Sequence, residues 1–304
     1  MSCSFVATIC VCKVNWGRFS VRPLNMLRRF WKTVHLICFA TWLLSCTSGR
    51  ESPDKQLIGS ANEQIPYKVK QEIEKEFPGA LPYAIAIDSL LSQLSRVGIA
   101  ADQILWGQST CVDDITNTKE KMVHPEIKGP FTFGGLGGLP FTGITGVEDF
   151  AHHVPEEGTA VLFVGPHVGY REGEGWGKIL RHGQTHSSSC CGALYAALNK
   201  LQKNEIKAGS LSESDYQEQI IEQLALHHSQ EILTAKEPLV TLTKVVFNEA
   251  QRKMTEYAQQ VHERHFAYAV VVVGVIINSD YQYDDYLWIE HVAIKDIKRD
   301  VWLK

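Results

Sequence analysis

One nearly unbroken apolar run near the C-terminus constrains the fold more than any other feature. Residues 268–277 include four consecutive valines, Val270 to Val273, and no charged side chain. A strand with one face in water alternates apolar and polar residues, whereas a continuous apolar run is typical of a strand covered on both faces. Such strands belong mainly to parallel sheets sandwiched between helices. The run therefore predicts the buried centre of a parallel sheet.

The rest of the chain alternates between helical and strand patterns. Apolar residues at helical spacing predict amphipathic helices over 69–77, 83–97, 192–201, 214–233 and 242–264. Short apolar runs predict further strands at 104–106, 161–164 and 286–294. Strands that alternate with helices are typical of a mainly parallel central sheet flanked by helices. We therefore expect one α/β domain over residues 65–304.

Residues 1–50 have the character of a targeting leader. Basic residues precede an apolar run over 33–44, which holds no acidic residue. The run is shorter than the roughly 20 residues of a membrane-spanning helix, but it fits the apolar region of a secretory signal. It ends in residues 43–46, which resemble a bacterial lipobox, in which the cysteine (here Cys46) is lipidated and becomes the new N-terminus. The alternative is an uncleaved signal anchor.

The leader and the segment after it predict a location for the protein. Met26 would be the natural start for such a signal, and the polar residues 51–64 read as a flexible tether. We expect secretion across the inner membrane, attachment to a membrane through the lipidated Cys46, and a periplasmic or cell-envelope lipoprotein.

The charge composition argues against nucleic acid as a binding partner. The chain carries 30 basic and 34 acidic residues, which gives a formal net charge of −4. Proteins that bind nucleic acid usually carry a basic patch or stripe, and the sequence has none. We therefore do not expect nucleic acid as a partner.

Cysteine is scarce beyond residue 50, where only Cys111, Cys190 and Cys191 occur. An odd number of thiols with one adjacent pair suits a disulfide framework poorly. Two thiolates and one imidazole, by contrast, are ligands that zinc prefers, with a fourth position left for water. Cys111 and His167 follow directly on predicted strands, at the strand ends where open α/β sheets bind ligands. The alternative is three unrelated buried thiols and a core histidine.

A glycine-rich segment spans residues 129–143. It lacks the Gly-Lys-Ser/Thr ending of a phosphate loop and the Gly-x-Gly-x-x-Gly pattern of a dinucleotide site, and it follows no predicted strand. We expect instead a tight loop, packed by its backbone over an active site. Phe131, Phe133 and Phe141 would make it an apolar wall for a small nonpolar substrate.

Several motifs together are similar to the limiting-CO2-inducible protein B/C family, which is related to the β-class carbonic anhydrases. They are the Cys-x-Asp of residues 111–113, the glycine-rich 134–143, His-His-Val-Pro at 152–155, Gly-Pro-His-Val-Gly at 165–169 and Cys-Gly-Ala at 191–193. The resemblance implies a β-carbonic-anhydrase-like fold and a homodimer. It also implies a Zn²⁺ ion held by Cys111, His167 and Cys191, with Cys190 as a bystander.

The resemblance implies catalytic roles for Asp113 and an arginine. Asp113 takes the place of the aspartate in the β-class Cys-x-Asp-x-Arg motif, but Ile115 stands where the arginine would be. An arginine from elsewhere has to complete the Asp–Arg pair, and we expect Arg181. In an extended segment Asp114 would point to the opposite side from Asp113.

The function that these features predict is the reversible hydration of CO2 to bicarbonate by a zinc-dependent carbonic anhydrase, a lyase. Zinc lowers the pKa of bound water from about 15.7 toward about 7, and Asp113, kept ionised by Arg181, would orient the resulting hydroxide. One alternative is a zinc-bearing but inactive protein of the same family that senses bicarbonate or binds a partner. Another is a metal-dependent hydrolase of a larger substrate, which would need a roomier cleft.

Overall fold

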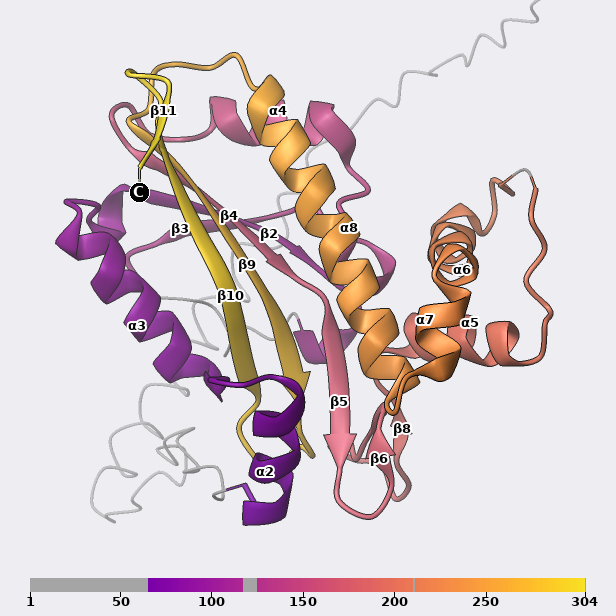
Figure 1. Ribbon diagram of the computed structural model, residues 1–304. Helices are drawn as coiled ribbons and strands as arrows, with labels where there is room; N and C mark the ends of the chain where they lie inside the picture. Colours follow the sequence, from indigo (N-terminus) through magenta and orange to yellow (C-terminus); the bar gives the residue numbers. More distant parts are fainter. Residues whose placement is uncertain (1–64, 117–124, 210, 304) are drawn as a thin grey trace, which may run out of the picture. The chain divides into compact units, whose positions relative to one another are not determined.

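The computed structural model describes residues 65–116, 125–209 and 211–303 (Figure 1). The predicted leader over 1–50 and the tether over 51–64 lie outside these residues. No helix within the described residues is both long and apolar enough to cross a membrane.

A mixed but mostly parallel sheet forms the centre of the domain. Its strands run in the order β1-β10-β9-β4-β2-β3. Neighbours β9–β4, β4–β2 and β2–β3 are parallel, whereas β10 is antiparallel to β9. The bounds are β1 Leu81–Pro82, β2 Ile104–Thr110, β3 Lys128–Thr132, β4 Thr159–Gly165, β9 Tyr268–Asn278, β10 Tyr286–Asp296 and β11 Val301–Leu303. The prediction of an α/β fold with a mainly parallel sheet is confirmed.

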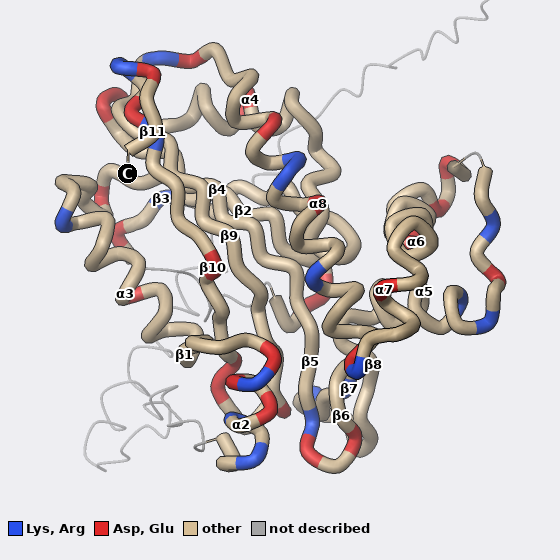
Figure 2. Tube along the Cα trace, viewed as in Figure 1, with Lys and Arg blue, Asp and Glu red and all other residues tan. Residues whose placement is uncertain are grey.

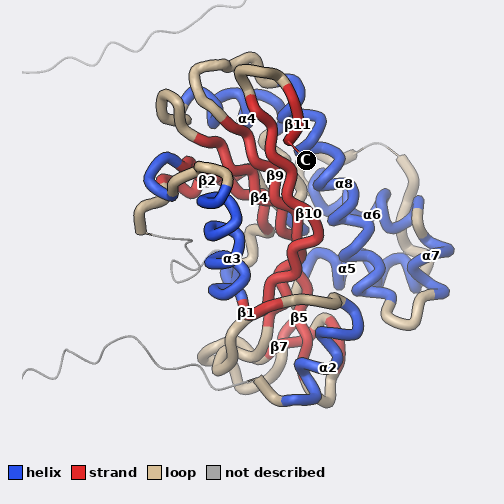
Figure 3. The backbone as a smooth tube through the Cα atoms, turned by 60° about the vertical axis from the view of Figure 1, so that its left-hand side comes forward, coloured by secondary structure: helices blue, strands red, loops and turns tan. Residues whose placement is uncertain are grey.

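The valine run of β9 is continuous because helices cover both faces of the sheet (Figure 3). Val270 and Val272 belong to the apolar cluster beneath helix α3 (Tyr83–Arg96). Val271 and Val273 point the other way, into the larger cluster that includes helices α4 (Gly143–His152) and α8 (Pro238–Gln260). The alternation of a strand is therefore present, but both of its faces are apolar.

The remaining helices agree with the predicted segments except in one place. They are α2 Tyr67–Glu76, α5 Gly192–Gln202, α6 Tyr216–His227 and α7 Ser229–Thr234. The single helix expected over 214–233 is wrong, because the chain breaks at His228 into α6 and α7. The break lets Ile232 pack fully buried in the core. Figure 2 shows basic and acidic residues interspersed along these helices and their connections.

The glycine-rich segment holds more regular structure than its composition suggests. Residues 128–132 form the edge strand β3 on β2, and residues 143–152 form α4, neither of which the sequence predicted. The loop between them packs tightly by its backbone, as expected. A Cβ at Gly134 would lie 1.9 Å from the Thr110 carbonyl, and one at Gly138, whose φ is +83°, would lie 3.0 Å from the Cα of Pro166.

The phenylalanines of this segment belong to the core. Phe131 and Phe133 pack against Phe150 of α4, with ring centroids 5.6 and 5.2 Å away. Phe141 packs against Tyr216 of α6. Phe133 is fully buried. This placement does not support the interpretation of these rings as the wall of a substrate pocket.

The topology places the ends of two strands side by side. β2 and β4 are parallel and in register up to the pair Thr110 and Gly165, so the residues after each strand leave at the same edge of the sheet. Pro166 interrupts β4, and the chain continues as β5 (His167–Arg171), which is parallel to the end of β9. Further short strands follow: β6 Gly175–Trp176, β7 Lys178–Ile179 and β8 Ser188–Ser189. The β7–β8 pairing then returns the chain to this edge.

Candidate metal centre

Three side chains from separate segments meet at this edge of the sheet. Cys111 follows β2, His167 begins β5, and Cys191 lies just before the first turn of α5. All three are buried, and their ligand atoms lie within 4.8 Å of one another. The structure thus brings together the three side chains that were predicted to bind metal, while their role as ligands stays a prediction.

The geometry of the set suits a zinc ion. The Sγ atoms of Cys111 and Cys191 lie 3.6 Å apart, and two thiolates bound to one tetrahedral zinc at about 2.3 Å would lie about 3.8 Å apart. The Nε2 atom of His167 is buried and has no hydrogen-bond partner among the described residues. An unpaired buried nitrogen is costly unless something binds it. Two sulfurs and this nitrogen therefore form a preformed three-ligand site.

Cys190 lies on the other side of the histidine ring. Its Sγ is 3.5 Å from Nδ1 of His167 and 3.3 Å from Oδ1 of Asn278. The Nδ1 atom of His167 in turn lies 2.7 Å from the same oxygen. Burial raises the pKa of the Cys190 thiol, which keeps it a hydrogen-bond donor. Cys190 therefore contacts the Nδ1 edge of the His167 ring, whereas Nε2 lies at the opposite edge.

In the absence of metal, a hydrogen bond joins the thiol groups of Cys111 and Cys191. The hydrogen bond with Cys191 lowers the pKa of Cys111 to about 4, and the same bond together with burial raises the pKa of Cys191 well above its usual value. Burial opposes a charge on His167, yet its electrostatic interactions and hydrogen bonds with the neighbouring cysteines raise its pKa. A metal ion would replace these protons, since ligand cysteines and histidines bind metal in their deprotonated forms.

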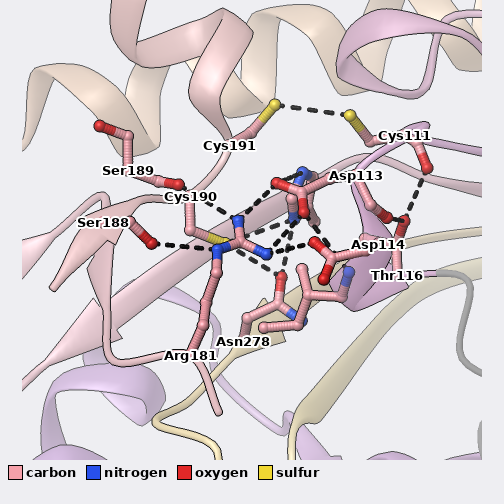
Figure 4. A network of polar contacts seen from close by, with 12 residues as sticks. Cys111, Asp113, Asp114, Thr116, Arg181, Ser188, Ser189, Cys190, Cys191 and Asn278 are labelled. Carbon is pink, nitrogen blue, oxygen red and sulfur yellow. Dashed lines mark hydrogen bonds and ion pairs between the residues drawn. The ribbon is translucent and has the colours of Figure 1, made fainter. Parts of the chain in front are cut away.

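Asp113 lies beside the cluster and is bound by an arginine (Figure 4). Arg181, from the β7–β8 connection, donates from Nη1 to Oδ1 and from Nη2 to Oδ2 of Asp113, both at 2.8 Å. Burial opposes ionisation of Asp113, but these bonds lower the pKa of its carboxyl. Oδ2 of Asp113 lies 3.9 Å from Nε2 of His167. The carboxylate is thus ionised, close to the cluster and turned toward the guanidinium.

The segment after Cys111 is not extended, which corrects the expectation for Asp114. The Thr116 hydroxyl donates to the Cys111 carbonyl at 2.6 Å, and residues 114–116 form a 3₁₀ turn. Both Asp113 and Asp114 therefore reach Arg181, the second with Oδ1 2.6 Å from Nη1. The Asp114 side chain is 87% exposed, so its bond is largely screened by water.

Arg181 makes two further hydrogen bonds, to Ser188 and Ser189. It also lines a surface cavity. Its Nε donates to the Ser188 hydroxyl at 3.0 Å and its Nη2 to the Ser189 carbonyl at 3.3 Å. A surface cavity of about 510 Å³ is lined by Asp114, Ile115, Arg181, His182, Ser279, Tyr281 and other residues of α3 and of the β9–β10 connection. Ile115, which stands at the position of the β-class arginine, therefore lines the same cavity as Arg181, which pairs with Asp113 in this chain.

Sequence reasoning missed Asn278 and Asp285. Asn278 ends β9, is fully buried, and contacts both His167 and Cys190. Asp285 binds the Asn278 amide from the far side, with Oδ2 3.0 Å from Nδ2. The available signal was a polar residue that directly follows the apolar run of β9, where Asn278 comes after Ile277. A residue just past a buried parallel strand lies where α/β sheets place ligands.

Comparison with known proteins identifies a family and a fold that the chain shares. Residues 80–296 match the family described as limiting CO2-inducible proteins B/C beta carbonic anhydrases. The crystal structure of PtLCIB4, a homolog of the limiting CO2-inducible protein LCIB, is similar with a TM-score of 0.69 and 26% identity, covering 77% of this chain and 98% of PtLCIB4. That of LCIB itself gives a TM-score of 0.57 at 18% identity, covering 76% of this chain and 96% of LCIB. No protein with a curated description matches the chain.

The family match spans most of the described domain and includes the three predicted metal ligands, Asp113 and Arg181. The chain therefore belongs to the limiting CO2-inducible protein B/C family of β-carbonic-anhydrase-related proteins.

Proposed function

We propose that this protein is a zinc-dependent carbonic anhydrase that interconverts CO2 and water with bicarbonate and a proton. The observation that carries the proposal is the bidentate pair of Arg181 with Asp113 beside three preformed ligands. The pair takes one lone pair on each carboxylate oxygen of Asp113, so the aspartate would be a neighbour of a bound metal ion rather than its ligand. A fourth position is then available to water, as zinc enzymes require.

Cys111, Cys191 and Nε2 of His167 would hold the zinc ion. When bound, zinc lowers the pKa of water toward about 7 and so supplies the nucleophile that attacks CO2 at neutral pH. Two thiolates donate more charge than two imidazoles would, so this ligand set acidifies water less than an all-histidine set. The protein's own residues therefore have to contribute through orientation.

Asp113 performs that orientation in the proposed mechanism. Its carboxylate would accept a hydrogen bond from the nucleophilic water and so orient it toward CO2, which is a gain through alignment. Arg181 keeps Asp113 ionised, and the pKa of Asp113 is accordingly low. The adjacent cavity of about 510 Å³ gives small molecules space beside the pair.

One distance favours a second candidate, a zinc-bearing protein without catalytic activity. Oδ2 of Asp113 lies 3.9 Å from Nε2 of His167, and Arg181 divides its donors between Asp113 and the exposed Asp114. If Arg181 released Asp113, the carboxylate could take the fourth position and close the site. A protein in that state would bind zinc and serve in bicarbonate sensing or partner binding.

Stopped-flow CO2 hydration on purified protein, with the metal content measured on the same sample, tests the proposal. We expect about one zinc per chain and a rate that rises with zinc content. A fully zinc-loaded preparation with no hydration rate above the buffer background would reject the proposed carbonic anhydrase activity. It would favour the inactive, zinc-bearing protein in which Asp113 closes the site. The expected homodimer stays a prediction, which light scattering on the same sample tests.

A further inference from the structure

We propose that Asp285 positions His167 for metal binding by acting through Asn278. The inference rests on the zinc centre proposed above and assigns roles to two residues outside the predicted ligand set. His167 begins β5 and Asn278 ends β9, on neighbouring parallel strands. Both residues are fully buried, so no water competes for the contact between them.

The orientation of the Asn278 amide is fixed from the Asp285 side. A side-chain amide has one end that donates and one that accepts, whereas a carboxylate only accepts. Nδ2 of Asn278 lies 3.0 Å from Oδ2 of Asp285, so the donating end has to face Asp285. The carboxylate is itself anchored, because its Oδ1 accepts the backbone N–H of Ser279 at 2.9 Å.

In the neutral ring, the form in which histidine binds metal, the fixed amide then decides which nitrogen of His167 carries hydrogen. Oδ1 of Asn278 faces Nδ1 at 2.7 Å and can only accept, so Nδ1 donates. The Cys190 thiol donates to the same oxygen at 3.3 Å. Both lone pairs of Oδ1 of Asn278 therefore accept a hydrogen bond. Nε2 is left as the nitrogen that offers a lone pair to a metal, and it is the atom that lies toward Asp113.

The reversed amide would oppose metal binding. If Nδ2 of Asn278 faced the ring, Nδ1 of His167 would have to accept, and the hydrogen would move to Nε2. That hydrogen would occupy the position of the metal. Asp285 excludes this arrangement because it offers the amide no hydrogen. Hydrogen-bond partners of metal ligands typically contribute a factor of about 10 to 100 in metal affinity.

The test compares the zinc dissociation constants of the purified full chain and its variants by competition with a chromogenic chelator. In Asp285→Asn the new amide both donates and accepts, so Asn278 can reverse. We expect the dissociation constant to rise about 10- to 100-fold. Asp284→Asn removes the same charge from the adjacent, exposed position and should leave the constant unchanged.

The swap of the two side chains, Asn278→Asp with Asp285→Asn, separates positioning from mere loop stability. In the swapped protein the carboxylate introduced at position 278 accepts from His167 and Cys190. The amide introduced at position 285 donates to that carboxylate through its nitrogen and accepts the backbone N–H of Ser279 through its oxygen. Every hydrogen bond and the total charge are retained, so zinc affinity should return to the wild-type value even if the single variant folds poorly.

The outcomes are distinguishable. Equal affinity of the wild type and a folded Asp285→Asn, or a folded swapped protein that stays weak, would overturn this inference and leave the zinc centre standing. A wild type that binds no zinc would overturn the zinc centre and this inference together.

Discussion

Replacement of Arg181 by alanine should damage the proposed reaction more than replacement of any other residue that is not a metal ligand. The guanidinium makes two charge-assisted bonds of 2.8 Å to Asp113, and the two side chains are only 16% and 14% exposed. A hydrogen bond to a charged group contributes about 1.5–3 kcal/mol. The variant would therefore release several kcal/mol of restraint on a carboxylate that lies 3.9 Å from Nε2 of His167.

The rate of CO2 hydration should fall in Arg181→Ala because the released Asp113 carboxylate can reach the metal. Asp113 would compete with water for the fourth metal position, so both the orienting group and the nucleophile would be affected. Loss of a partner of this kind typically costs about 10- to 100-fold, and the size of the lost restraint places Arg181→Ala at about 100-fold in kcat/KM. Asp113→Ala, which removes the orientation but also the competitor, should lose about 10-fold to 100-fold while it retains zinc.

Stopped-flow hydration of CO2 on zinc-loaded variants measures these losses, and a double variant tests their cause. If Arg181 acts by restraining Asp113, then Asp113→Ala added to Arg181→Ala should restore part of the rate. Asp114→Ala is the matched control, because it removes an exposed partner of the same guanidinium and should be mild. Full activity in Arg181→Ala, or a double variant slower than either single one, would refute the reasoning.

Three further predictions concern the ligands, the pair and the leader. Cys111→Ser, His167→Ala and Cys191→Ser should each abolish zinc binding by mass spectrometry, whereas Cys190→Ser should retain it; the reverse result for Cys190 and Cys191 would exchange their assignments. The lowered pKa of Asp113 means that its ion pair stabilises the fold above the usual aspartate pKa and is lost as the pH falls through the lower, folded value. The difference in urea stability between wild type and Arg181→Ala should therefore be constant above about pH 5 and shrink as the pH falls below about 4, and a difference that stays constant at low pH would contradict the assignment. Expression from Met26 in a bacterium should give a membrane-associated protein labelled by fatty acid, and Cys46→Ala should remove the label; cleavage elsewhere with release of soluble protein would reject the lipoprotein.

The central strands, and the positions of Cys111 and His167 at strand ends, were readable from the sequence because their signals are local. The valine run of β9 predicts burial on both faces wherever the strand lies in the sheet. Cys111 and His167 follow apolar strands directly, and parallel strands that start in register also end together. Edge strand β3 was hidden, because glycine and proline in residues 128–132 are poor strand formers.

The network around the ligands depends on tertiary contacts that no spacing reveals. Arg181 lies 68 residues from Asp113, and only the short β7–β8 pairing brings its guanidinium back to the sheet edge. Asn278 is 111 residues from His167. The 3₁₀ turn that brings Asp114 to Arg181 depends on the Thr116 hydroxyl, which competes with the extended conformation assumed from the pattern. Such side-chain bonds decide the details of a site after the fold has set its position.

The central claim is that the cluster of Cys111, His167 and Cys191, with Asp113 restrained by Arg181, hydrates CO2. The most direct measurement is the exchange of ¹⁸O between CO2 and water, followed by mass spectrometry at chemical equilibrium on the same protein with and without zinc. We predict catalysed exchange in the zinc-loaded protein that disappears when a chelator removes the metal and returns when zinc is added. Exchange at the uncatalysed rate in a fully zinc-loaded wild type would contradict it.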